Sequence, residues 1–141
     1  IVPRLGVFLR NLGLINNVEF SWVEKIYQGY NNSNPGWIAS KTALYDISNI
    51  CKKNNIHLFV AVYPLLIELD NYKGIKAHNT IINFCDSLNI SSHDLYPIFK
   101  NKKSRNFWIN HMDGHPNADA HSMVTKKLYP LIESMYFSNK E

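Results

Sequence analysis

Three histidines and two aspartates fall within the eleven residues HMDGHPNADAH, at positions 111–121. His115 follows Asp113 by two positions, so its Nδ1 hydrogen can be donated to the carboxylate while Nε2 stays available as a general base. Gly114 relieves the backbone between them, and Asn117 is a good N-cap for a helix. The segment therefore predicts an acid–base pair in a loop that leads into a helix. The alternative is a polar loop whose only task is capping.

A metal site is a competing interpretation of the same residues. His111, Asp113 and His115 alternate, so an extended chain would place all three on one face, and His121 could approach from the helix. Such a metal could activate water for hydrolysis. Against this interpretation, Pro116 forces a turn directly after His115, and the sequence offers no second His/Cys/Asp cluster to supply more ligands.

The other histidines suggest structural roles. Ser92, His93 and Asp94 are consecutive, and neighbouring side chains diverge, so they cannot converge as a catalytic triad. We expect Asp94 to be a turn or cap residue and His93 to face solvent. His57, in a predicted strand, and His78, on a predicted helix, are expected to be core or edge residues with their hydrogen bonds satisfied.

The elements that would position the pair alternate between helix and strand. IHLFVAVYP is apolar on both alternating faces, which predicts a central parallel strand over Ile56–Tyr63 that helices cover on both sides. NISSHDLYPIF (89–99) reads as a loop with one helical turn. Pro130 is expected to kink or split the last helix. The predicted helices are 20–30, 37–53, 72–88 and a run from Asn117; the second predicted strand is NFWIN (106–110).

This order of elements predicts an α/β fold with right-handed crossovers and a parallel sheet. Two strands are too few, because such a sheet normally has about five. Either residues 1–36 contain a further strand, or the chain is the C-terminal part of a larger domain.

Composition limits the class of protein. A chain of 141 residues with 45% hydrophobic and 18% charged residues is typical of one globular domain. The net charge of +4 comes with short basic clusters, Lys52-Lys53 and Lys100 to Arg105, which we interpret as solvated surface rather than a nucleic-acid site. No apolar run reaches the ~20 residues of a membrane span.

The ends and the cysteines leave the compartment open. The sequence starts with isoleucine, and its first residues lack a signal-peptide pattern, so we expect the true start of the protein to lie upstream. Cys51 and Cys85 fall at core-like helix positions and are expected to be buried free thiols.

DGHPNADAH followed by an apolar helix resembles the C-terminal block of the SGNH, or GDSL-type, hydrolase family, in which Asp-x-x-His-Pro precedes the last helix. The resemblance covers residues 20–135 and is most specific at Asp113, His115, Pro116 and Asn117. It implies that Asp113 is the triad acid and His115 the base. It also implies a three-layer, flavodoxin-like α/β/α fold with no metal or organic cofactor.

The sequence departs from that family at two points. The Asp precedes the His by two positions rather than three, a spacing found in branches that resemble polysaccharide O-acetyltransferases. The family's nucleophile lies in a Gly-Asp-Ser motif, and this sequence has no Gly-Asp-Ser, Gly-x-Ser-x-Gly or Gly-x-Asn-Asp. The segment therefore looks like a catalytic pair without its serine.

We accordingly expect residues 1–141 to be the C-terminal portion of a single SGNH hydrolase-like domain, whose serine lies outside this chain. The substrate would be a small-molecule, glycan or lipid ester; the ester itself, the choice between hydrolysis and acyl transfer, and the oligomeric state stay open. The rivals are a metal-dependent hydrolase that uses His111, Asp113 and His115, and a non-catalytic SGNH-like protein that binds a glycan, a lipid or a partner.

Overall fold

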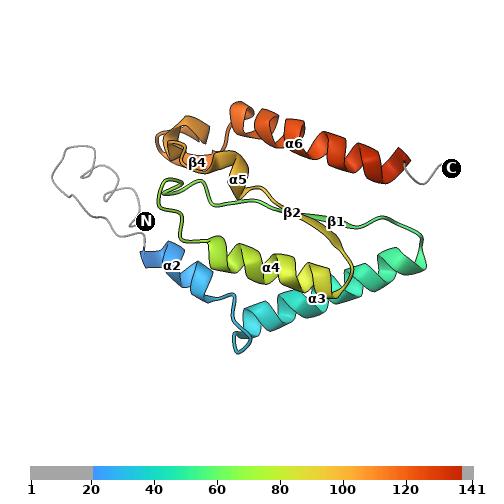
Figure 1. Cartoon of the computed structure of the whole chain (residues 1–141). Helices are drawn as coiled ribbons and strands as arrows, with labels where there is room; N and C mark the ends of the chain where they lie inside the picture. The colour runs from blue at the N-terminus through green and yellow to red at the C-terminus, as the bar shows by residue number, and fades with distance from the viewer. Residues whose placement is uncertain (1–20, 138–141) are drawn as a thin grey trace. The chain divides into compact units, whose positions relative to one another are not determined.

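The structure, a computed structural model, describes residues 21–137, which form a mixed α/β protein (Figure 1). The described residues form two compact units: one contains residues 21–63 and 73–94, the other residues 64–72 and 95–137. The elements in chain order are α2 (Ser21–Gln28), α3 (Pro35–Lys53), β1 (Phe59–Val62), α4 (Ile75–Ser87), β2 (Ser91–Asp94), α5 (Tyr96–Phe99), the 3₁₀ helix η1 (Ser104–Phe107), β3 (Trp108–Asn110), β4 (Asp113–Pro116) and α6 (Ala118–Phe137).

Within residues 21–63 and 73–94, a parallel strand pair and three helices build the first unit. Phe59 of β1 lies opposite Ser91 of β2, and Val62 lies opposite Asp94. α4 lies between the two strands in the sequence and packs against both (Figure 1). This is the arrangement that a parallel pair requires, since its strands need a crossover connection. The buried apolar side chains of this unit are Val23, Trp37, Val62, Ala77, Cys85 and Ile90.

The start of α3 follows from local chemistry. The Asn34 side chain accepts a hydrogen bond from the Trp37 backbone N–H at 3.1 Å, and Pro35 occupies the first helical position. An N-cap asparagine followed by proline is a favourable helix start, because the proline lacks only an N–H that would have no partner there. The helix therefore begins two residues before the predicted boundary.

A hairpin and three helical segments build the second unit. β3 and β4 pair in antiparallel fashion, with Trp108 opposite Pro116 and Asn110 opposite Asp113. Its core contains two aromatic contacts: Tyr72 stacks on Tyr96 at 4.4 Å, and Phe99 meets Phe107 edge to face at 5.2 Å. The buried apolar side chains of this unit are Leu66, Leu69, Tyr72, Leu95, Tyr96, Phe99, Phe107 and Ala120.

The predicted α/β class and the parallel strand are confirmed, while three details of the sheet prediction are wrong. The parallel partner of β1 is Ser91–Asp94, which was expected to be a loop. The NFWIN strand pairs antiparallel with β4 and does not join β1. The predicted burial of 56–63 on both faces is not found either, because Ala61 is exposed and Ile56 lies before the strand and is 56% exposed.

The helices agree more closely with the sequence pattern. α2, α3, α4 and α6 all occur where apolar periodicity predicts them. Pro130 does not split α6, because Pro130 and Lys126, whose carbonyl loses its backbone donor, are both solvent-exposed. Of residues 1–36, the described part contains helix and turn but no strand, and residues 1–20 lie outside the described part. Among the helices within 21–137, none has the length and apolar character needed to cross a bilayer.

Candidate functional site

The hairpin strand β4 brings the two predicted site residues into contact. Asp113 Oδ1 accepts hydrogen bonds from the His115 backbone N at 3.0 Å and from the ring nitrogen Nδ1 at 2.5 Å. Residues two apart on a strand share a face, which explains why the side chains meet. With Nδ1 donating to the carboxylate, Nε2 carries the lone pair. The imidazole is 82% exposed and the carboxylate 41% exposed, so Nε2 is accessible to a reacting group.

The electrostatics of the pair favour an ionised carboxylate. The His115 backbone N–H, followed by its ring nitrogen, lowers the pKa of Asp113, because both hydrogen bonds stabilise the charged form. A carboxylate that remains ionised can hold the imidazole in one tautomer and stabilise the imidazolium formed on proton transfer. The geometry is therefore suited to general base chemistry at Nε2.

The opposite face of the hairpin contacts another segment of the same unit, residues 64–72. The Trp108 indole N–H donates to the Leu66 carbonyl oxygen at 2.5 Å. Gly114 packs on the same indole, since a Cβ built there would meet the ring at 3.5 Å. The expectation that Gly114 relieves the backbone between Asp113 and His115 is wrong: Gly114 lies within β4 and its φ is not positive. Its hydrogen atoms instead face the Trp108 ring.

Asn117 joins the hairpin to α6. Its Oδ1 accepts a hydrogen bond from Ala120 N at 3.0 Å, which confirms the predicted N-cap. Its Nδ2 donates to the Asn106 carbonyl at 2.9 Å and to the Trp108 carbonyl at 3.2 Å. One side chain thus defines both where the helix starts and where the strand carrying His115 ends.

Within the described residues, the geometry does not bring together the ligands of the competing metal-site interpretation. His111 lies in the turn between β3 and β4, and His121 lies on α6; both are exposed. Within residues 21–137 no group of three His, Cys, Asp or Glu side chains is arranged to hold a metal ion. The hairpin turn explains this outcome, because the extended chain that would align His111 with His115 is interrupted at residues 111 and 112.

A second His–Asp pair, not predicted from the sequence, lies in the first unit. His78 Nδ1 is 2.7 Å from Asp94 Oδ1. The His78 side chain is 5% exposed and that of Asp94 is 28% exposed. His78 is therefore the satisfied core residue that was expected, while the prediction that Asp94 is a turn or cap residue is wrong. It ends β2, and the two residues are brought together by the packing of α4 on that strand.

The remaining candidates from the sequence are structural. His93 is half-buried rather than solvent-facing, and His57 is exposed and precedes β1 rather than lying within it. Cys51 and Cys85 are free thiols, as predicted; Cys85 is fully buried and Cys51 half-buried. Burial is the main cause that raises the pKa of the Cys85 thiol, which makes it a poor nucleophile.

Comparisons with protein-family models, with curated proteins and with solved structures find no match for this chain. The resemblance to SGNH hydrolases accordingly depends on the motif residues of the hairpin and the helix that follows it.

Proposed function

We propose that this chain is the C-terminal portion of an SGNH-type hydrolase that acts on ester bonds. The observation that carries the proposal is the hydrogen bond between Asp113 and His115, which leaves an exposed imidazole Nε2 on a hairpin directly before the capped helix α6. On this proposal the β1–β2 pair is part of a larger three-layer α/β/α sheet, and both units belong to one domain.

In the proposed reaction, a serine outside this chain attacks the ester carbonyl. His115 Nε2 takes the serine hydroxyl proton as the bond from oxygen to carbonyl carbon forms, and then passes this proton to the leaving alkoxide. Water then attacks the acyl-enzyme, and His115 accepts one of its protons and returns it to the serine. Asp113 orients the ring throughout and stabilises its positive charge. The substrate class is a small-molecule, glycan or lipid ester, and no metal or organic cofactor takes part.

The tautomer of His115 can be checked in this chain alone. Nitrogen-15 NMR of neutral His115 should show a proton on Nδ1 and none on Nε2, because the Asp113 carboxylate accepts only from a protonated Nδ1. Asp113→Ala should allow both tautomers. A proton on Nε2 in the parent chain would remove the general base and contradict the proposal.

Activity requires the chain together with the sequence that precedes it in its gene. The 141 residues alone should not hydrolyse a short-chain aryl ester, because a base without a placed nucleophile has little to act on. In the extended protein His115→Ala should lower kcat/KM by about 10⁴-fold or more, and Asp113→Asn by less, because the base transfers the proton whereas the acid only orients it.

His111→Ala is the matched control and should be nearly neutral, since His111 lies in the hairpin turn. Robust turnover by the 141 residues alone would refute the proposal that the nucleophile lies elsewhere. If His111→Ala were as damaging as His115→Ala and added zinc or manganese restored the activity, a metal-dependent mechanism would replace this one.

A further inference from the structure

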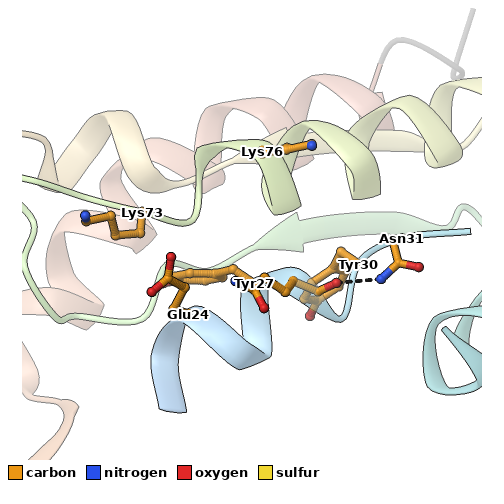
Figure 2. A pocket seen from close by; sticks show the side chains of 7 residues that line it. Glu24, Tyr27, Tyr30, Asn31, Lys73 and Lys76 are labelled. Carbon is orange, nitrogen blue, oxygen red and sulfur yellow. Dashed lines mark hydrogen bonds between the residues drawn. The ribbon is translucent and has the colours of Figure 1, made fainter. Parts of the chain in front are cut away.

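A cavity of about 320 Å³ lies in the first unit, between α2 and the start of α4 (Figure 2). This volume is at the lower end of the range of small-molecule sites. Figure 2 shows two walls: α2 supplies Glu24 and Tyr27, and the segment after it supplies Tyr30, while Lys73 lies just before α4 and Lys76 in its first turn. The lining side chains that concern us are Glu24, Tyr27, Gln28, Tyr30, Lys73 and Lys76.

The α2 wall is held in place by packing. Val23 on α2 is buried, with 5% exposure. The Tyr30 ring lies 5.3 Å from the Trp37 ring, which in turn lies 5.9 Å from Phe84 on α4. Asn31 closes the turn after α2, since its amide donates to the Gln28 carbonyl at 2.6 Å. A small ligand would therefore meet a preformed wall, which reduces the ordering cost of binding.

The charged side chains around the cavity have no ionic partner in the part of the chain that the structure describes. Across residues 21–137, the side chains of Lys73, Lys76 and Glu24 form no ion pair and no hydrogen bond. Two ammonium groups and one carboxylate leave a net charge of +1 (2 − 1) at the cavity. A ligand with negative charge toward the lysine wall would complement them.

The Glu24 carboxylate and the rings of Tyr27 and Tyr30 indicate which kind of anionic ligand would fit the cavity. Glu24 repels a bare anion and accepts hydrogen bonds, so it favours a ligand that also has hydroxyl donors. The Gln28 amide can both donate to and accept from hydroxyl groups. The tyrosine rings provide apolar faces with a polar tip, which suit the C–H surface of a ring.

We infer that this cavity binds a sugar ring that carries a carboxylate or a phosphate. The inference goes beyond the proposed esterase function and is independent of it, because it uses no residue of the hairpin. One of the two lysines, whose ammonium groups point to opposite ends of the cavity (Figure 2), binds the anionic group. Glu24 and Gln28 bind the hydroxyls, and Tyr27 and Tyr30 contact the ring.

Binding can be measured by NMR titration and calorimetry of the 141-residue chain with four probes: glucuronate, glucose 6-phosphate, glucose and inorganic phosphate. At least one anionic sugar should bind, and shift the amides around Gln28 and Lys76. Glucose and inorganic phosphate should each bind at least about 10-fold more weakly than the anionic sugar. Glucose lacks the anionic group, and inorganic phosphate lacks the sugar ring. Preference between the first two probes identifies the anionic group as carboxylate or phosphate.

Variants that remove charge distinguish binding at the cavity from non-specific electrostatic binding to the protein surface. Lys73→Gln with Lys76→Gln should weaken binding of the anionic sugar by about 10-fold or more, and should leave the fold intact because both side chains are exposed. Lys53→Gln, at the exposed end of α3, removes the same charge away from the cavity and should change nothing. Glu24→Gln should reduce the preference for the sugar over inorganic phosphate.

Three results would overturn the inference. The first is the absence of binding by both anionic sugars at millimolar concentration. The second is binding of glucose or of inorganic phosphate as tight as that of the anionic sugar. The third is a double lysine variant that folds, by circular dichroism, and binds as tightly as the parent.

Discussion

Replacing Asn117 by alanine removes the side chain that joins the β3–β4 hairpin to the last helix. The change deletes the cap on the Ala120 N–H and the two hydrogen bonds from Nδ2 to the Asn106 and Trp108 carbonyls. The backbone hydrogen bond from Asn117 N to the Phe107 carbonyl, 2.9 Å long, is kept. The perturbation is therefore confined to three side-chain hydrogen bonds.

The expected cost follows from these contacts. Loss of an N-cap costs about 1 kcal/mol. A neutral hydrogen bond contributes about 0.5–1 kcal/mol, and the bond to the exposed residue Asn106 should lie at the low end of that range. Asn117→Ala should thus lower the free energy of unfolding by about 2 kcal/mol, a factor of about 30 in the folded-to-unfolded ratio. Asn117→Ser keeps a capping oxygen and should lose about 1 kcal/mol.

Urea unfolding followed by circular dichroism measures both losses, and hydrogen exchange at the Ala120 amide reports the cap alone. Exchange at Ala120 should be faster in Asn117→Ala than in Asn117→Ser. Asn83→Ala, at an exposed position of α4, is the control and should stay within about 0.5 kcal/mol of the parent. Equal losses for alanine and serine, or unchanged exchange at Ala120, would refute the dual role of Asn117.

Three further predictions concern titratable groups. Hydrogen bonds from His115 lower the pKa of Asp113, so this carboxyl should stabilise the fold above its ordinary pKa, and the stabilisation should be lost as pH falls through the depressed pKa. In His115→Ala, carbon-13 NMR should show the pKa of Asp113 returning only partly to its ordinary value, because the backbone N–H of residue 115 still donates to it. Buried Cys85 should resist iodoacetamide in the folded chain and react in urea; rapid alkylation of the folded chain would contradict its burial. Asp94→Ala should lower the unfolding free energy by about 1–3 kcal/mol, because buried His78 loses the hydrogen bond to this carboxylate, and Asp94→Asn by less; equal effects in urea titrations would contradict this account.

The parts of the fold that could be predicted are those with local causes. Apolar periodicity and capping residues lie within a few positions of each other, so the start of α6 after Asn117 could be predicted directly and that of α3 to within two residues. The contact between Asp113 and His115 is local in the same sense, because residues two apart meet in any extended segment. The prediction of the candidate site depended on this short separation.

The parts that could not be predicted depend on pairing between distant segments. The strand Ser91–Asp94 has a polar sequence, SSHD, without the apolar alternation that signals a strand; its conformation comes from pairing with β1 and packing against α4. The strand that pairs with Trp108–Asn110 is Asp113–Pro116, with the sequence DGHP. Glycine and proline have low strand propensity, so this strand could not be predicted from its residues. His78 and Asp94 lie 16 residues apart, and no spacing rule connects them.

The two His–Asp pairs share the same hydrogen bond but differ in burial. In both pairs a carboxylate oxygen meets Nδ1 within hydrogen-bond distance. The His78 ring is 5% exposed, so a substrate cannot reach it and its hydrogen bond serves the packing of α4 on β2, where a low dielectric strengthens it. The His115 ring is 82% exposed, so solvent weakens the contribution of its hydrogen bond to stability. Of the two imidazoles, only that of His115 leaves Nε2 accessible to a substrate, and this contrast is why the proposed esterase chemistry is assigned to His115 and not to His78.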